Sequence, residues 1–254
     1  MANKKKKPAP AAQGWSEKKK NIVTIAVLVA FVALIVGICV IAINCGKSDS
    51  DKADDNTTNS PETLEPSTSG LEVSETPTDY VQLTVQYVNS QGQVATGDIV
   101  VHLRADAAPI TVQNFKDLVA SGFYNGLTFH RIVSGFMIQG GDPKGNGTGG
   151  SENTIKGEFS ENGVANPLSH TRGVISMARS ASYDSASSQF FIMHATNTGL
   201  DGQYAAFGEV YSGMDVVDGI AGTSVTYGSS GERSQPLNPP KILKACFVTV
   251  PDAQ

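Results

Sequence analysis

Apolar and polar residues alternate along short stretches of the carboxyl-terminal two thirds of the chain, with the period of two that half-buried β-strands show. The clearest stretch is residues 81–88, with the sequence VQLTVQYV. Further strands are predicted at 99–103, 128–133, 136–139, 174–178, 189–193, 205–210 and 242–250. Many short strands separated by Gly-, Ser- and Asn-rich turns favour a closed or nearly closed antiparallel barrel.

Apolar residues at helical spacing predict two helices within the same region. The first begins at Pro109, whose fixed φ suits a first helical turn, and ends at Gly122. The second fits residues 213–221, with Ser212 as its amino-terminal cap. The inward-facing residues of the two helices are Val112, Phe115, Leu118, Val119, Met214, Val217 and Ile220. The fold class is therefore dominated by β-structure, with two helices covering the strands.

The amino-terminal 45 residues follow a different pattern, because residues 22–43 are apolar except for Thr24 and Gly37. At about 1.5 Å per residue this stretch is about 33 Å long, which matches a hydrocarbon core of about 30 Å. A cleaved signal sequence has a shorter apolar core of about 7–15 residues. The sequence therefore predicts one transmembrane helix, at residues 21–45.

Charges on either side of this helix predict its orientation. Residues 1–20 contain seven Lys and one Glu, and acidic residues follow the apolar stretch. The positive-inside rule then makes residues 1–20 a basic cytoplasmic tail. We expect a single-pass protein of the cell membrane whose main domain lies outside the cytoplasm.

Cys45 leaves a second kind of attachment open. A cysteine followed by Gly46 and an acidic, Ser-rich stretch resembles the start of a bacterial lipoprotein, in which the cysteine is lipidated after cleavage. Asn44 stands where that signal normally has Gly, Ala or Ser, so we favour the uncleaved anchor. Both alternatives place the main domain outside the cytoplasmic membrane.

Residues 46–79 have the composition of a disordered linker. They contain nine acidic residues against two Lys, are rich in Ser and Thr, and include no aromatic residue. Such a segment cannot bury enough apolar surface to fold. All aromatic residues except Trp15 and Phe31 lie beyond it, so the folded domain is predicted at residues 80–254.

Charge and motifs exclude several classes of function. Residues 80–254 carry a net charge of −4, which leaves no basic patch for a nucleic acid. The Gly-rich stretch at 140–150 lacks the GK[ST] ending of a phosphate-binding loop. The four histidines show no metal-ligand spacing, and no GxSxG motif occurs. We therefore expect no metal and no cofactor.

Four segments carry polar residues that composition does not explain: FHRIVSGFMIQGGD at 129–142, RGVISMAR at 172–179, SSQFFI at 187–192 and LDGQYAAFG at 200–208. Strand alternation places Met137 and Gln139 on one face, and likewise Gln189 and Phe191. Each strand thus presents an amide beside a large apolar group. Convergence of these faces near Arg131 would create an apolar pocket rimmed by hydrogen-bond donors.

In their order and spacing, these segments resemble the signature blocks of the cyclophilin-type peptidyl-prolyl cis–trans isomerases, over about residues 80–250. The spelling MAR and the short Gly-rich loop look bacterial. The resemblance implies an eight-stranded antiparallel β-barrel capped by two α-helices. It also implies an enzyme that accelerates rotation about X–Pro bonds.

The resemblance also assigns roles to individual residues, with Arg131 as the catalytic arginine. The residues of the proline pocket would be Phe136, Met137, Phe191, Leu200 and Tyr204. Those that position Arg131 and the substrate would be Gln139 and Gln189. The edge against which the peptide backbone lies would be formed by Ala178, Arg179 and Ser180. Gly199 stands where many family members have Trp or another aromatic residue associated with cyclosporin binding, so weak inhibition by cyclosporin is expected.

We expect an isomerase that assists the folding of exported or surface proteins, with Pro-containing polypeptides as partners and a monomeric catalytic domain. Because Arg stays charged, the rate should be nearly independent of pH between about pH 6 and 8. The alternative is a tethered module that binds Pro-containing segments without turnover. The presence of Arg131 with both glutamines favours the enzyme.

Overall fold

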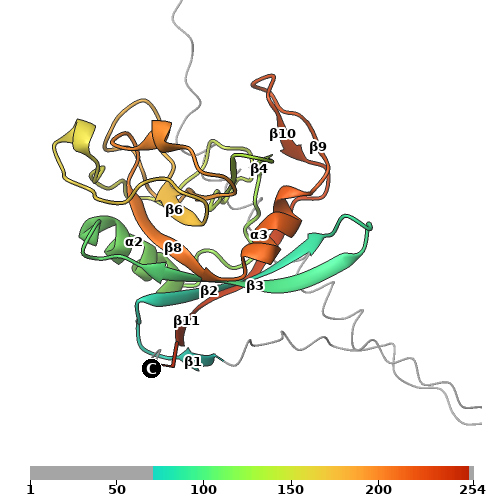
Figure 1. The fold of residues 1–254 in the computed structure, drawn as a ribbon, viewed down its shortest axis with the longest axis horizontal. Helices are drawn as coiled ribbons and strands as arrows, with labels where there is room; N and C mark the ends of the chain where they lie inside the picture. Colours follow the sequence, from blue (N-terminus) through green and yellow to red (C-terminus); the bar gives the residue numbers. More distant parts are fainter. Residues whose placement is uncertain (1–70, 252–254) are drawn as a thin grey trace, which may run out of the picture. The chain divides into compact units, whose positions relative to one another are not determined.

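The computed structural model describes residues 71–251 of the chain. Within this range, nine strands form one antiparallel sheet in the spatial order β1-β11-β2-β3-β8-β6-β7-β5-β4 (Figure 1). Their bounds are β1 (Glu72–Ser74), β2 (Tyr80–Val88), β3 (Val94–Leu103), β4 (Arg131–Val133), β5 (Met137–Gly140), β6 (Val174–Met177), β7 (Phe190–Met193), β8 (Ala206–Ser212) and β11 (Lys241–Thr249). Each of the eight strands predicted from the sequence overlaps one of these, so the β-dominated fold class is confirmed.

The longest ladder shows how the alternating pattern produces the core. β2 and β3 pair antiparallel from Tyr80–His102 to Val88–Val94 without a register shift. In β2, Val81, Leu83 and Val85 are completely buried, as the alternation predicts. Their burial removes three apolar side chains from water, each worth about 1.5–3 kcal/mol.

The prediction of a closed or nearly closed eight-stranded barrel is confirmed only in part, because the sheet has nine strands and its ladder is open between β1 and β4. Near the gap, Thr128 forms single bridges to Asp142 and to Lys241. The backbone N–H of Phe129 also donates to the Pro240 carbonyl, at 2.9 Å. These contacts are isolated and do not continue as a ladder, so strand β4 starts at residue 131 instead of 128.

In the described part of the chain, two α-helices pack against the sheet: α2 (Pro109–Ala120) and α3 (Met214–Ala221) (Figure 1). The predicted start of α2 at Pro109 is confirmed. Its first turn is capped from a distance, because the N–H groups of Ile110 and Thr111 donate to the buried carboxylate of Glu158, at 3.1 and 2.7 Å. Two short 3₁₀ helices, η1 (Ser160–Asn162) and η2 (Thr198–Leu200), lie in the connecting loops.

Ser212 is not the cap of α3, contrary to the prediction. The N-cap is Gly213, which adopts a left-handed conformation with φ of 90° and makes no side-chain capping bond. A Cβ atom at this position would collide with the carbonyl oxygen of Asp98. Glycine is therefore required at the turn, and Ser212 becomes the last residue of β8.

A separate two-stranded hairpin, β9 (Val225–Tyr227) and β10 (Arg233–Pro236), was not predicted. It stands out from the sheet, with β10 beside β4 (Figure 1). The short strand β1 was also unforeseen: composition assigned residues 72–74 to the linker, whereas here they pair with the end of β11.

The predicted membrane helix at 21–45, the tail at 1–20 and most of the predicted linker fall outside the described residues. Within residues 71–251, no helix is both long and apolar enough to span a membrane.

Candidate active site

An apolar pocket of about 230 Å³ lies on the face of the sheet built by β4, β5 and β7. Its lining consists of Arg131, Phe136, Met137, Gln139, Ala178, Arg179, Phe191, Leu200 and Tyr204. These are nine of the eleven site residues predicted from the sequence. The other two, Ser180 and Gln189, line an adjoining polar cleft of about 370 Å³.

Strand register brings the central residues together. Arg131 of β4 is paired with Gln139 of β5, and Gln139 is paired with Phe191 of β7. Directly paired residues of neighbouring antiparallel strands point to the same face of a sheet. The cation, the amide and the aromatic ring therefore form one row across three strands, although they are up to 60 residues apart in the sequence.

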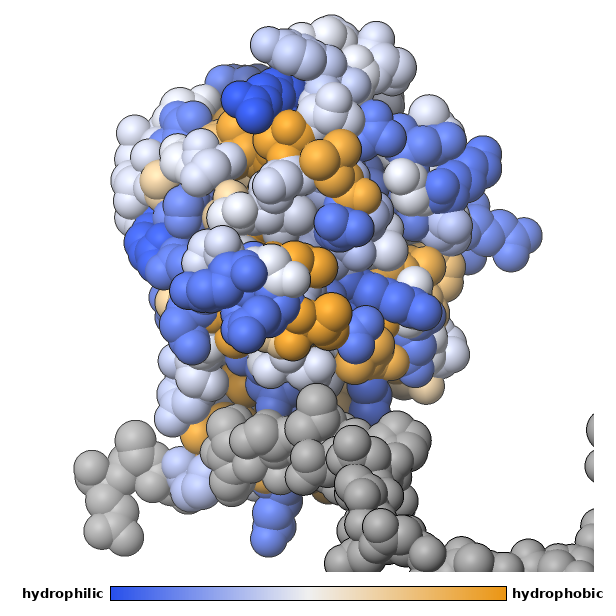
Figure 2. All heavy atoms as spheres, turned by 90° about the vertical axis from the view of Figure 1, so that its right-hand side faces the viewer, coloured by the Kyte–Doolittle hydropathy of each residue, from blue (hydrophilic) through white to orange (hydrophobic). Residues whose placement is uncertain are grey.

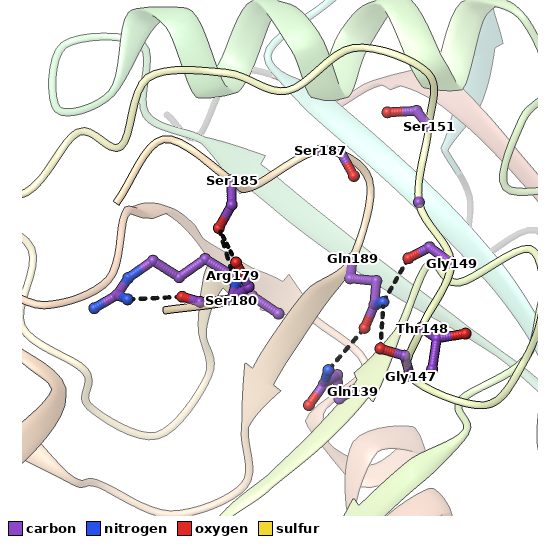
Figure 3. Close-up of a pocket in the computed structure, with 12 residues that line it drawn as sticks. Gln139, Gly147, Thr148, Gly149, Ser151, Arg179, Ser180, Ser185, Ser187 and Gln189 are labelled. Carbon is purple, nitrogen blue, oxygen red and sulfur yellow. Dashed lines mark hydrogen bonds between the residues drawn. The ribbon is translucent and has the colours of Figure 1, made fainter. Parts of the chain in front are cut away.

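A chain of amides holds one side of the Arg131 guanidinium. Its Nη1 donates to Gln139 Oε1 at 3.1 Å, and Gln139 Nε2 donates in turn to Gln189 Oε1 at 2.9 Å. Gln189 Nε2 donates to the carbonyls of Gly149 and Gly147, at 2.6 and 3.2 Å (Figure 3). The catalytic candidate is thus connected, through two side chains, to the backbone of the Gly-rich loop.

The other side of the guanidinium is held by Glu232, which sequence reasoning missed. Arg131 Nε donates to Glu232 Oε2 at 2.7 Å, and Nη2 donates to Oε1 at 2.8 Å. Glu232 lies between β9 and β10, 101 residues from its partner. The hydrogen bonds from Arg131 lower the pKa of this carboxyl group below its ordinary value, so Glu232 is ionised at neutral pH.

The aromatic side of the pocket rests on a buried polar group. The rings of Phe191 and Tyr204 meet edge to face, with centroids 5.8 Å apart. Behind Phe191, the ring of His170 stacks at 6.0 Å. His170 Nδ1 lies 2.8 Å from Asp201 Oδ1, and its Nε2 lies 3.0 Å from Ser176 Oγ. These two partners fix the orientation of the imidazole, and the imidazole supports the ring that lines the pocket.

Burial determines the charge states of this group. Desolvation lowers the pKa of His170, although Asp201 opposes the shift, so the imidazole is neutral at neutral pH. Partial burial disfavours ionisation of Asp201, but hydrogen bonds from Ser169 and His170 outweigh that effect and lower its pKa. A neutral imidazole thus contacts an ionised carboxylate.

The Arg179 guanidinium binds to other groups of the protein. Nε donates to the Gln203 carbonyl at 3.0 Å, and Nη1 donates to the Ser180 carbonyl at 2.9 Å. Its Cζ lies 4.8–5.2 Å from the ring centroids of Phe159, Tyr183 and Tyr204. Figure 3 shows the side chain directed away from the two glutamines. Arg179 therefore supports the wall of the pocket through Tyr204.

The arrangement combines a fixed cationic donor with an apolar pocket. Arg131 Nη1 lies 3.6 Å from Met137 Sδ, and the guanidinium carbon lies 6.0 Å from the centroid of Phe136. The Arg131 side chain lines the pocket and is 33% exposed. Such a site can hold a small apolar ring and donate a hydrogen bond to an atom at its edge.

Comparisons with known proteins agree on one family. The family model described as "Cyclophilin type peptidyl-prolyl cis-trans isomerase/CLD" matches residues 87–246, which is more than half of the chain. A "Probable peptidyl-prolyl cis-trans isomerase" of Brucella suis is 44% identical over 161 residues, covering 59% of this chain and 76% of the relative. "Peptidyl-prolyl cis-trans isomerase B" of Bacillus subtilis is 46% identical over 123 residues, covering 48% and 82%.

A solved structure is similar as well. The cyclophilin-type peptidyl-prolyl cis-trans isomerase of Cryptosporidium parvum, crystallised in the presence of the dipeptide Ala-Pro, has a TM-score of 0.51 and 27% sequence identity. The similarity covers 66% of this chain and 99% of that protein.

Proposed function

We propose a site and a cellular setting for this protein from one premise: the chain belongs to the cyclophilin-type peptidyl-prolyl cis–trans isomerase family, and it accelerates rotation about X–Pro bonds. The proposed site is the apolar pocket beneath Arg131, with the pyrrolidine ring of the substrate among Phe136, Met137 and Phe191.

The chemistry of the prolyl bond explains why a guanidinium over an apolar pocket suits this reaction. Rotation about an amide C–N bond meets a barrier of about 18–20 kcal/mol, because the nitrogen lone pair is delocalised. In the twisted state that delocalisation is lost, and the prolyl nitrogen becomes a hydrogen-bond acceptor. A donor fixed at that position stabilises the twisted state more than either planar state, which is the difference in binding that catalysis requires.

The proposal rests on one observation, the double fixation of Arg131 by Gln139 and Glu232 at the edge of the pocket. A donor that is already oriented needs no reorganisation when the bond twists. Every factor of ten in rate requires about 1.4 kcal/mol of such stabilisation, so one well-placed donor has a large effect.

Substitution of Arg131 tests the proposed site. In Arg131→Ala, we expect kcat/KM for a Pro-containing peptide to fall by about 10²–10³, the loss that follows removal of one fixed donor. Arg104→Ala is the matched control, because the Arg104 side chain is also 33% exposed and also pairs with a carboxylate, that of Asp106. Equal rates for wild type and Arg131→Ala would contradict the proposal. Retained peptide binding would then favour the tethered binding module.

We also propose that residues 21–45 anchor the chain in the cytoplasmic membrane and that the isomerase domain acts outside it, on exported or surface proteins. Support comes from the uncharged apolar stretch and the lysines that precede it. After expression of the full chain in a bacterium, the protein should stay in the membrane pellet after alkaline carbonate washing. External protease should digest residues 80–254 in spheroplasts. Release by carbonate would contradict the anchor.

Intact mass separates the two kinds of anchor. An uncleaved helix predicts the mass of the whole chain, unchanged by Cys45→Ser. A lipoprotein predicts a shorter chain that begins at Cys45 and carries acyl groups, and Cys45→Ser would abolish that processing.

A further inference from the structure

Glu232 occupies the part of the Arg131 guanidinium that a carboxylate of a substrate would otherwise bind. The Nε and Nη2 groups form a fork that matches the two oxygens of a carboxylate, and paired bonds of this kind are among the strongest in proteins. Both positions of the fork are filled by Glu232, at 2.7 and 2.8 Å. The Glu232 side chain is itself 39% exposed, so the part of its carboxylate that Arg131 does not cover remains accessible.

The hairpin that carries Glu232 also forms one wall of a second polar cleft, of about 510 Å³. Gly228, Ser229 and Ser230 lie on the hairpin side, and residues 145–147 of the Gly-rich loop lie on the other. Arg131 and Gln139 line both this cleft and the proline pocket. Glu232 is bound to Arg131, which lines the cleft, so a chain that extends from a bound proline into this cleft passes the Arg131–Glu232 pair.

Arg131 is the cation paired with Glu232, and the other charged groups nearby are held by other partners. Arg179 is occupied by two carbonyls and three aromatic rings. Arg233, the residue after Glu232, donates to the Val225 carbonyl of its own hairpin, at 3.3 Å. His130, which also lines the cleft, has a pKa lowered mainly by burial and is neutral at neutral pH. Figure 2 shows hydrophobic patches separated by hydrophilic side chains on the side of the molecule that carries the hairpin.

We propose that Glu232 is a specificity-determining residue: it excludes substrates that have an acidic side chain next to the proline. A substrate carboxylate meets a like charge and finds the fork of Arg131 already filled. Neutral side chains meet neither obstacle. This is selection by repulsion of the wrong ligand rather than by attraction of the right one. The inference rests on the proposed site at Arg131.

Competition between isosteric peptides tests the inference. Two short peptides differ only in having Glu or Gln beside the proline. Each competes with a neutral Pro-containing reporter peptide for binding to the full chain. One such pair carries the variable residue before the proline, and a second pair carries it after the proline. For wild type at low salt, we expect the inhibition constant of the Glu peptide to exceed that of the Gln peptide about tenfold at one of the two positions, which corresponds to about 1.4 kcal/mol. In Glu232→Gln this ratio should fall to one or below, because loss of the carboxylate frees the fork of Arg131.

Two further variants identify the cause. Glu232→Asp keeps the charge and should keep a ratio well above one. Glu209→Gln changes the net charge equally at an exposed position of β8 and should behave as wild type. The proposal is overturned if the ratio is the same in wild type and Glu232→Gln at both positions, or if Glu209→Gln lowers it as much. The reporter peptide contains no acidic residue, so its isomerisation rate without a competitor tests the proposed site separately.

Discussion

Substitution of Gln139 tests the proposed site sharply, because its effect on kcat can be compared with that of substituting Gln189. Gln139→Leu keeps the approximate volume of the side chain but removes the acceptor of Arg131 Nη1 and the donor to Gln189. Hydrogen bonds to charged groups contribute about 1.5–3 kcal/mol. Loss of one of the two constraints on the guanidinium should therefore lower kcat by about 10–100-fold.

Gln189→Leu provides the graded comparison. Gln189 touches Gln139 and the Gly-rich loop, so it acts on Arg131 through one intervening side chain. We expect a smaller loss, of about fivefold, which corresponds to about 1 kcal/mol.

The assay follows isomerisation of a Pro-containing peptide over a range of concentrations, so that kcat and KM are obtained separately, and thermal unfolding verifies the fold of each variant. Because both substitutions disturb the orientation of the donor rather than the apolar pocket, kcat should fall more than KM rises. A Gln139→Leu enzyme whose kcat stays within twofold of wild type, with an unchanged fold, would refute the reasoning. So would a larger loss in Gln189→Leu than in Gln139→Leu.

Three other predictions concern stability and inhibition. Glu158→Ala leaves two N–H groups of the first turn of α2 without their acceptor, so the free energy of unfolding in urea should fall by about 1–2 kcal/mol while kcat/KM changes little. The lowered pKa of His170 means that the unfolded chain binds protons more readily than the folded one, so stability should fall as pH drops below about 6.5. The lowered pKa of Asp201 adds a further loss below about pH 4, and Asp201→Asn should remove that second part from melting curves. With Gly199 in place of an aromatic residue, cyclosporin should inhibit weakly, and nanomolar inhibition in a titration would contradict this expectation.

The sequence was sufficient for the parts of the site that depend on local pattern. Alternation along 136–139 and 189–193 places Met137, Gln139 and Phe191 on the correct faces, and antiparallel pairing of β4, β5 and β7 then joins them to Arg131. Strand periodicity thus predicts which side chains share a face of one strand, whereas the pairing that joins them to Arg131 is seen only in the structure.

Contacts between distant segments could not be anticipated in this way. The segment around Glu232 is polar and rich in Gly and Ser, and no periodicity marks it as strand or connects it to Arg131. The burial of His170 against Phe191 depends on the packing of a loop behind β7, which no local motif encodes. Arg179 was predicted at the peptide edge by motif position alone, whereas its aromatic neighbours come from three separate loops.

The overall outline of the sheet was predictable, but its closure was not. Composition and turns favour a barrel, whereas the ladder depends on whether residues 128–130 pair continuously with their neighbours. Thr128 makes only single bridges, to Asp142 and Lys241, so the ladder is interrupted there. Similarly, Ser212 is a residue type that often caps helices, but Gly213 adopts a left-handed conformation and is itself the N-cap, so α3 starts after it.

The most direct test of the central claim is the rate of cis–trans interconversion of a peptide that is already bound. Magnetisation-exchange NMR at saturating peptide measures that rate on the enzyme, independently of affinity. If the guanidinium of Arg131 stabilises the twisted prolyl bond, Arg131→Ala should bind the peptide with similar affinity and interconvert it at least about 10²-fold more slowly than wild type. Interconversion of bound peptide at the wild-type rate in Arg131→Ala would contradict the account.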